Sequence, residues 1–392
     1  MNELCPNWFS HCRQQPSYWL AWLLLAGLWL AGCQTAAPTA TPTTSTPTTL
    51  SPTIAVITTV AETTPCALHT PSRLLAFSAN GQYLAYGYQE STRNRLYLLP
   101  VEGASAPQLL ADDGWEFAWD PQGERLVYAG ASGRSLTLLD LSGEMVGEIV
   151  AGWQHASPAW SPDGTAIALL HTARRRDAVG LAASGLMWVR LDDLESPQLA
   201  FSLQQLATLD SGAQRFDSGP VWSPDGSAIA VVAADGLFRV ELAGNAPRRL
   251  TAADVCVQRP LWSPDGAQIA FLSAPIFSAP SGGWGLQVIN ADGSGLVTLI
   301  GDSNLYLEQF AWSPDGAQIA FTARAAAAEP DLYLINRDGS GLQQLAAPVT
   351  GPKYATAWSP DGSALALLAG NEMGLIDLSS RSWALLGVLP QP

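Results

Sequence analysis

The sequence predicts an all-β fold, a seven-bladed β-propeller of four-stranded antiparallel blades. Three observations predict it. The pentapeptide WSPDG, or a looser variant of it, begins at residues 77, 119, 160, 222, 262, 312 and 358. Each copy is followed by a short alternating apolar run, which is typical of a β-strand. The copies are spaced like the supersecondary units of repeat proteins, which bury their faces only by packing against neighbours.

The repeated motif has the composition of a tight turn. Five copies read WSPDG, and the other two read WDPQG from Trp119 and FSANG from Phe77. Proline fixes φ at the second turn position, and glycine takes a positive φ at the last one. We therefore expect each motif to join two antiparallel strands. The aromatic residue ends the first of these strands, where we expect it to pack in the gap between neighbouring blades.

Further apolar runs complete each unit. A third run follows in most units, at residues 96–99, 136–139, 187–191, 286–289, 332–335 and 374–378, and a fourth comes after it. Seven units of four strands fall within the range of natural propellers. Residues 383–388 offer a fourth strand for the last unit, and residues 53–62 offer an alternative. The sequence leaves open which terminus closes the ring.

A longer pattern surrounds the motif and resembles a known family. P-x-WSPDG-x-x-IAF, followed by INxDGSGLxxL, is clearest in residues 260–296 and 309–342. It resembles the WD40-like PD40 repeat of the TolB family of periplasmic propellers, over residues 72–389. Family members usually carry six blades behind a small α/β domain, and this sequence differs in both respects. The same repeat also builds the propellers of prolyl-oligopeptidase-type peptidases, so the resemblance implies a fold rather than a function.

The N-terminal segment predicts export. Residues 1–32 read as a signal peptide, because the apolar run at residues 20–30 is too short for a standard membrane span. The run ends in LAGC, which resembles a bacterial lipobox and implies that Cys33 becomes the acylated first residue. Acyl chains would anchor the protein to a membrane. Residues 33–65 then form a Thr/Pro-rich tether, and residues 66–392 form the propeller. We expect an exported lipoprotein on the cell surface or the periplasmic side.

The net charge and the absence of catalytic motifs argue against several classes of function. The formal net charge is −15, which argues against a nucleic-acid partner. No G-x-S-x-G elbow, H-E-x-x-H or C-x-x-C motif occurs. We therefore expect no metal, no cofactor and no enzymatic activity. In the exported protein, Cys66 and Cys256 either form a disulfide or remain separate buried thiols.

The residues three to five positions before each motif are the candidate binding site. In a propeller the first strand of each unit lines the channel, so these residues are expected at its mouth. They are rich in charge, in a chain with only 14% charged residues. The candidates are Arg73, Trp115, Glu116, His155, Asp217, Gln258, Arg259, Glu308, Gln309, Lys353 and Tyr354.

Three functions fit such a mouth. The first is a monomeric, non-catalytic platform that binds an envelope protein or peptide. The second is a binding or sensor protein for a small polar ligand or a glycan in the channel. The third is a propeller hydrolase or lyase, with Glu116, His155 and Asp217 as its catalytic candidates.

Overall fold

A computed structural model describes residues 73–389, except 91–92, 103–105, 131–134, 151–156, 172–184, 203–215, 234–235, 245, 253–254, 276–283, 302–304, 326–327 and 348. The predicted signal peptide, Cys33, the tether and Cys66 therefore lie outside the described residues. Within the described part, no helix is long and apolar enough to span a bilayer.

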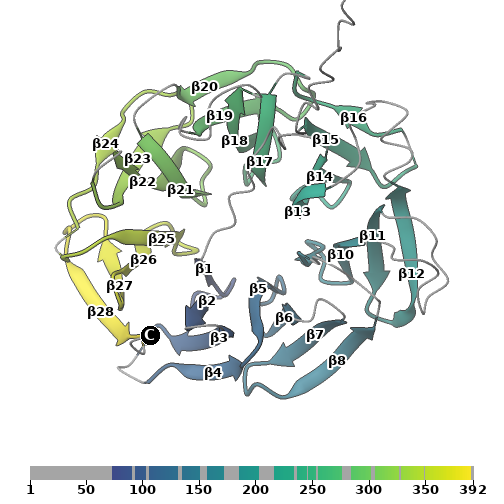
Figure 1. The fold of residues 1–392 in the computed structure, drawn as a ribbon, viewed down its shortest axis with the longest axis horizontal. Helices are drawn as coiled ribbons and strands as arrows, with labels where there is room; N and C mark the ends of the chain where they lie inside the picture. The colour runs from purple at the N-terminus through teal and green to yellow at the C-terminus, as the bar shows by residue number, and fades with distance from the viewer. Residues whose placement is uncertain are drawn as a thin grey trace, which may run out of the picture. The chain divides into compact units, whose positions relative to one another are not determined.

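Seven four-stranded antiparallel sheets are arranged in a ring (Figure 1). Each sheet is one blade, and its strands are consecutive in sequence. The innermost strands are β1 (Arg73–Phe77), β5 (Gly114–Trp119), β9 (Ala159–Trp160), β13 (Phe216–Trp222), β17 (Val255–Trp262), β21 (Leu305–Trp312) and β25 (Lys353–Trp358). The second strands are β2 (Tyr83–Glu90), β6 (Arg125–Gly130), β10 (Ala166–His171), β14 (Ala228–Ala233), β18 (Gln268–Pro275), β22 (Gln318–Ala325) and β26 (Ala364–Ala369).

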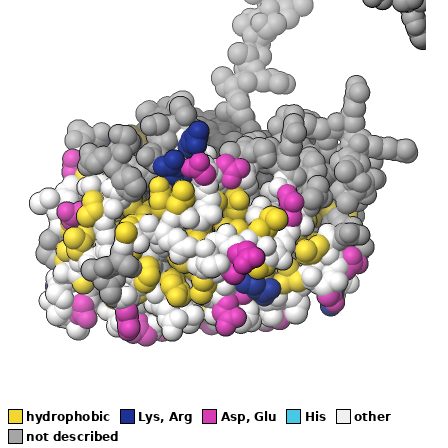
Figure 2. Space-filling view, turned by 90° about the horizontal axis from the view of Figure 1, so that it is seen from below, with side chains coloured by type: hydrophobic (Ala, Val, Ile, Leu, Met, Phe, Trp, Pro, Cys, Tyr) yellow, Lys and Arg dark blue, Asp and Glu magenta, His cyan; other side chains and the backbone are white. Residues whose placement is uncertain are grey.

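The two outer layers complete the blades and confirm the predicted fold class. The third strands are β3 (Arg93–Pro100), β7 (Ser135–Asp140), β11 (Gly185–Arg190), β15 (Gly236–Glu241), β19 (Gly285–Asn290), β23 (Asp331–Asn336) and β27 (Glu372–Asp377). The outermost strands are β4 (Gln108–Ala111), β8 (Met145–Val150), β12 (Asp193–Ser202), β16 (Arg248–Arg249), β20 (Val297–Ile300), β24 (Gln343–Gln344) and β28 (Trp383–Val388). Figure 2 views the rim near β4 and β8, where a band of apolar side chains crosses the surface.

The motif forms the predicted turn between the first and second strand of a blade. In the third blade, the amide of Gly164 donates to the carbonyl of Ser161 at 2.9 Å, and Gly164 has a φ of 70°. The Ser161 hydroxyl donates to Asp163 Oδ1 at 2.6 Å and accepts from the amide of Ala166 at 2.9 Å. Serine and aspartate thus bond the backbone groups that the turn leaves without strand partners.

The motif tryptophans pack between blades, as predicted. Trp160, for example, is 7% exposed in a buried cluster that the second and third blades share. Its indole Nε1 donates to the carbonyl of Ala118 in the preceding blade at 3.2 Å. The same bond is made by the other five motif tryptophans, at 3.1 to 3.2 Å. Six junctions therefore combine apolar burial with a hydrogen bond across the gap.

The junction between the seventh and first blades is different, because Phe77 replaces tryptophan there. Apolar side chains of both blades form one buried cluster, in which the rings of Tyr86 and Tyr97 stack at 5.2 Å. The amide of Leu389 donates to the carbonyl of Asn371 at 2.7 Å and fixes the end of the last blade. The fourth strand predicted at residues 383–388 is confirmed as β28. The alternative strand at residues 53–62 lies outside the described residues.

Cys256 is 2% exposed in β17 and is disulfide-bonded. Cys256 is therefore not a separate thiol, whereas its pairing with Cys66 stays a prediction. Its partner is outside the described residues, as are the other four cysteines of the chain.

Candidate functional site

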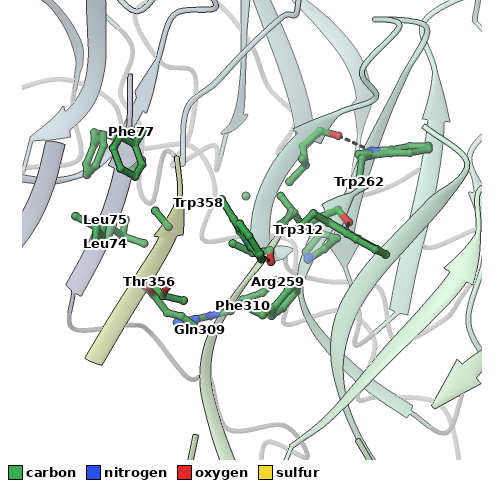
Figure 3. A pocket seen from close by; sticks show the side chains of 18 of the residues that line it. Leu74, Leu75, Phe77, Arg259, Trp262, Gln309, Phe310, Trp312, Thr356 and Trp358 are labelled. Atoms are coloured by element: carbon green, nitrogen blue, oxygen red, sulfur yellow. Dashed lines mark hydrogen bonds between the residues drawn. The ribbon is translucent and has the colours of Figure 1, made fainter. Parts of the chain in front are cut away.

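The candidate site is a cavity of about 680 Å³ in the centre of the ring (Figure 3). All seven blades contribute lining residues, mostly from the end of the innermost strand and from the motif turn that follows it. The wall has two tiers. One lies two to four residues before the motif aromatic residue, and the other is formed by the motif itself.

The first tier is polar. Six blades each place one hydrogen-bonding side chain on the wall of the cavity. They are Glu116, Ser157, Ser218, Arg259, Gln309 and Thr356. The first blade contributes Leu74 and Leu75 instead, so this ring of polar groups has an apolar gap at the first blade.

The second tier is aromatic and asymmetric. Trp262, Trp312 and Trp358 line the cavity together with Phe77, whereas the motif tryptophans of the second, third and fourth blades do not. Figure 3 shows these rings on neighbouring strands around one side of the cavity. Pro314 and Pro360 extend the apolar wall to the motif turns. The cavity is therefore polar around one tier and aromatic along an arc of four blades.

Irregular strand pairing brings the polar side chains to the wall. Pairing with the second strand shifts register in five innermost strands, between Gln258 and Leu261 in β17 and at similar positions in β5, β13, β21 and β25. A bulge changes the direction of a side chain and is frequent beside functional sites. At the bulge in β17, Arg259 has a φ of 54°, in the left-handed region that residues other than glycine rarely adopt.

Serines of neighbouring blades fix the two charged residues of the polar tier. Ser157 Oγ donates to Glu116 Oε2 at 3.0 Å. The amide of Arg259 donates to Ser218 Oγ at 3.1 Å. Gly219 leaves the space that Ser157 needs, because a Cβ at position 219 would lie 2.3 Å from the Cβ of Ser157. The carboxylate of Glu116 and the backbone of Arg259 are thus held in place.

Acidic groups of the motif turns lie next to the aromatic tier. Asp315 and Asp361 directly follow the two prolines on the wall. The hydroxyl of Ser313 lowers the pKa of Asp315, and the backbone amide of Ala317 adds to this effect. Ser359 lowers the pKa of Asp361 in the same way. These carboxylates carry negative charge at neutral pH, but their oxygens are bonded within the turns.

The structure brings three of the eleven predicted site residues to the cavity. Glu116, Arg259 and Gln309 line it. Gln258 is buried at 3% exposure and does not line it, because neighbouring residues of a strand point to opposite faces. Lys353 Nζ lies 3.5 Å from Asp331 Oδ1, and neither Lys353 nor Tyr354 lines the cavity.

The other five predicted residues have no described side chain. Arg73, Trp115, Asp217 and Glu308 are described only as strand residues, and His155 lies outside the described residues. Sequence reasoning missed Ser157, Ser218 and Thr356, although Ser218 and Ser157 lie three to four residues before a motif. These residues were missed because the candidates were chosen mainly for their charge, and serine and threonine are small and uncharged. It also missed the aromatic tier, because burial between blades was the only role expected for the motif tryptophans.

Within the described part of the chain, no group of three or more His, Cys, Asp or Glu side chains is placed to hold a metal ion. The polar tier instead offers one carboxylate, one guanidinium, hydroxyls and an amide. This arrangement suits hydrogen bonding and ion pairing with an organic ligand.

Comparisons with known proteins agree with the architecture. No protein-family model matches the chain, and no curated protein matches it. Among solved structures, it is similar to the oligogalacturonate lyase of Vibrio parahaemolyticus, with 13% identity and a TM-score of 0.57 over 77% of this chain and 86% of that one. It is similar to a puromycin-hydrolyzing peptidase of Mycobacterium tuberculosis, with 16% identity and a TM-score of 0.59 over 83% of this chain and 55% of that one.

TolB from Acinetobacter baumannii is also among the similar structures, with 18% identity and a TM-score of 0.48 over 67% of this chain and 63% of that one. At such identities the likeness shows the fold alone. The seven blades and their motif turns define the chain as a β-propeller with a central cavity. The TolB-like character of its repeat remains a resemblance in sequence, since the comparisons show the propeller fold alone.

One prediction needs correction. The absence of hydrolase and zinc motifs predicted no enzymatic activity, and this prediction is contradicted, since a lyase and a peptidase are among the similar structures with TM-scores above 0.5. The expectation relied on missing hydrolase and zinc motifs. An enzyme built on a propeller can use catalytic residues that belong to none of these motifs. Their absence from the sequence therefore does not exclude activity, because function depends on the site rather than on the fold.

Proposed function

We propose that the protein is a lipid-anchored, extracytoplasmic propeller that binds a small amphipathic ligand in its central cavity. One observation carries this proposal. A cavity of about 680 Å³ combines a tier of fixed polar groups with an arc of aromatic rings. Ligand sites commonly have volumes of about 300–1,000 Å³ and mostly apolar walls with a few placed polar groups.

The two tiers indicate how the ligand is oriented. Its polar groups would contact the tier that contains Glu116, Arg259 and Gln309, and its apolar part would pack on Trp312 and Trp358. Aromatic rings give large contact areas and fix the orientation of an apolar group. This supports a ligand with both characters rather than a purely polar one.

Blocking the cavity tests the proposal. Ala79 is exposed in the turn of the first blade and lines the cavity, so Ala79→Trp should fill part of it without disturbing the core. Ala317→Trp is the matched control, because Ala317 is exposed in the corresponding turn of the sixth blade and is not among the lining residues. We would screen amphipathic small molecules by thermal shift with the full chain in detergent and measure hits by calorimetry.

We expect hits that bind the native chain and the control equally and bind Ala79→Trp at least tenfold more weakly. The proposal would be contradicted if no compound binds, or if Ala79→Trp leaves the affinity of every hit unchanged. The anchor has its own test: metabolic labelling with a fatty-acid analogue should mark the native chain and not Cys33→Ser.

A second candidate function, binding of an envelope protein or peptide, is favoured by the rim. Leu109 in β4, Met145 in β8 and Val388 in β28 are 45%, 60% and 51% exposed. They belong to three consecutive blades and lie on outermost strands. Exposed apolar groups of this kind can mark protein contacts. A photoreactive residue at position 145 should crosslink a defined partner in cells, whereas the same residue at the exposed position 252 should not.

A further inference from the structure

We infer that the ligand of the central cavity is a neutral amide, which bonds backbone N–H and C=O groups of the sixth, seventh and first blades while its apolar part packs on the aromatic arc. This inference rests on the proposed function and names the chemical class of the ligand. The backbone groups belong to two positions of the innermost strand, the motif aromatic residue and the residue two positions before it.

The backbone of β25 in the seventh blade directs hydrogen-bonding groups to the cavity. An innermost strand pairs on one side only, because it lies at the end of its sheet. In an antiparallel pair, residues bonded to the partner strand alternate with residues whose N–H and C=O groups point the other way. The amide of Ser359 donates to the carbonyl of Ala364 at 2.9 Å, so the odd-numbered positions before it bond β26. Thr356 and Trp358 therefore turn their N–H and C=O groups toward the cavity that both residues line.

The sixth and first blades repeat this geometry. The amide of Ser313 donates to the carbonyl of Gln318, and that of Ser78 to the carbonyl of Tyr83, each at 2.9 Å. By the same alternation, the residues one and three positions before each serine face the cavity and line it. These residues are Leu75, Phe77, Phe310 and Trp312. Within the described part of the chain, the six cavity-facing amides of these three blades have no hydrogen-bond partner.

Prolines in the other part of the ring support the assigned direction. Pro158, Pro220 and Pro260 lie two positions before the motif tryptophan in the third, fourth and fifth blades, and all three line the cavity. Proline has no N–H, and within sheets it is confined to edges and bulges where no ladder bond is lost. The N–H at this position is therefore not needed to build a blade. The sixth, seventh and first blades carry other residues there and keep the donor.

Buried amides without a protein partner favour a ligand that accepts hydrogen bonds. Thr356 is 4% exposed and Leu75 is 8% exposed. Buried backbone groups in proteins are nearly always paired with protein or with water. An amide ligand offers a carbonyl to the N–H groups and an N–H to the neighbouring carbonyls, so it matches both groups of one edge residue.

The absence of charge in this part of the wall favours a neutral ligand. The charged members of the polar tier, Glu116 and Arg259, belong to the second and fifth blades. Among the described lining residues of the sixth, seventh and first blades, none carries a charge. A charged group placed there would lose its water without gaining a counter-charge, whereas an amide needs only hydrogen bonds.

The same three blades supply most of the aromatic arc. Figure 3 shows Phe310 and Thr356 together with Trp312 and Trp358, on the neighbouring strands β21 and β25. Aromatic rings give a large contact area and prefer defined orientations toward other rings. A ring attached to the amide can therefore pack on the arc while the amide bonds the backbone beside it.

Calorimetry on the full chain in detergent tests the inference from the side of the ligand. The probes share one ring: 2-naphthamide, its thioamide, 2-naphthoate and 2-naphthylmethylammonium. The thioamide keeps the shape and the N–H groups, but its sulfur accepts hydrogen bonds more weakly than oxygen. We expect 2-naphthamide to bind at least tenfold more tightly than each of the other three. N-acetyl-phenylalanine amide then distinguishes the two sources of the group: tighter binding than 2-naphthamide indicates a peptide backbone, and weaker binding indicates a small aromatic amide.

Two pairs of variants test the backbone groups. Thr356→Pro removes the N–H and the hydroxyl, whereas Thr356→Val removes the hydroxyl alone. Phe310→Pro and Phe310→Leu form the second pair, in which both variants lose the ring and only the first loses the N–H. We expect each proline variant to bind 2-naphthamide at least fivefold more weakly than its partner. Because three blades carry proline at this position, we expect both proline variants to fold, and urea unfolding checks this.

The results separate the inference from the proposed function. If 2-naphthamide and its thioamide bind equally, or if 2-naphthoate or the ammonium probe binds most tightly, the inference is overturned. The same holds if the proline variants bind like their partners, or if no probe binds. The proposed function survives these outcomes when Ala79→Trp weakens the binding of any probe or screening hit. Binding that Ala79→Trp leaves unchanged overturns the proposed function as well.

Discussion

The junction that closes the ring differs from the other six, and the difference coincides with the cavity. At six junctions an indole N–H bonds the carbonyl of the preceding blade. At the seventh, Phe77 is half-buried and has no N–H to donate. Residues 74–79 and 356–358 on the two sides of this junction all line the cavity.

The comparison shows that one position of the repeat can serve two purposes. Trp160 and Trp222 are buried between blades and do not line the cavity, so they act in packing alone. Trp312 and Trp358 pack in the same way, but they also present a surface to the cavity. Phe77 presents its ring to the cavity and makes no interblade hydrogen bond. Ring closure therefore relies on apolar burial, and space remains for a ligand.

The largest difference between the two kinds of junction is expected when the aromatic side chain is removed. The loss in the free energy of unfolding should be greater at a tryptophan junction than at the junction of Phe77. Trp312→Ala removes a side chain that is 6% exposed, and we expect a loss of about 3–5 kcal/mol in the free energy of unfolding. Phe77→Ala should cost about 1–2 kcal/mol, because one side of Phe77 already faces the cavity. Urea unfolding followed by circular dichroism measures both. Equal losses would show that the closing junction is not special.

Converting one junction into the other type should have a smaller effect. Trp312→Phe removes the indole N–H that bonds the carbonyl of Leu261 at 3.1 Å. We expect a loss of about 1–3 kcal/mol, because a buried carbonyl loses its partner. Trp284→Phe is the control, since Trp284 is half-buried outside the motif. If the two variants lose the same free energy of unfolding, the hydrogen bond does not tie the blades.

The reverse substitution, Phe77→Trp, should convert the closing junction into one like the other six. Phe77→Trp places an indole opposite the carbonyl of Ala357, which corresponds to the acceptors at the other junctions. We expect a gain of up to about 1 kcal/mol in the free energy of unfolding from the new bond. The larger ring also narrows the cavity, so ligand affinity should fall. Urea unfolding and calorimetry on the same preparation check both effects, and a gain in affinity would contradict the assignment of the site.

Low pH should destabilise the motif turns that contain aspartate but not the turn of the first blade, which contains Asn80. The hydroxyl of Ser263 and the amide of Ala267 lower the pKa of Asp265 to about 2, and Arg337 adds to this. Because the pKa of Asp265 in the folded protein lies below the usual aspartate value of 3.8, this stabilisation is present above pH 4 and is lost as the pH falls towards 2. In the first blade, Asn80 accepts from Ser78 at 2.7 Å and does not titrate.

Thermal unfolding between pH 2 and 7 measures this effect. We expect the melting temperature to fall below pH 4. The fall should be smaller in Asp265→Asn, which replaces the carboxylate with the residue type found in the first turn. An identical pH profile in the variant would show that Asp265 does not contribute to the acid sensitivity.

Much of the fold could be predicted because its signals are local. The positive φ of Gly164 and the bonds of Ser161 and Asp163 depend on five consecutive residues. The binding site could be predicted only in part. Proximity to the motif suggested Glu116 and Arg259 but also Gln258 and Lys353, because spacing alone does not tell on which face of a bulged strand a side chain lies.

The sequence by itself determined the number of blades, the strands in each, the turns and the aromatic residue between blades. These features follow from periodicity and turn chemistry, which operate over a few residues. The tertiary structure alone decided which motif tryptophans and which polar side chains line the cavity. Glu116 and Arg259 are separated by two blades in between, and only closure of the ring brings both of them to one cavity. That arrangement arises because each blade buries its faces against its neighbours, a property of the whole ring rather than of any one repeat.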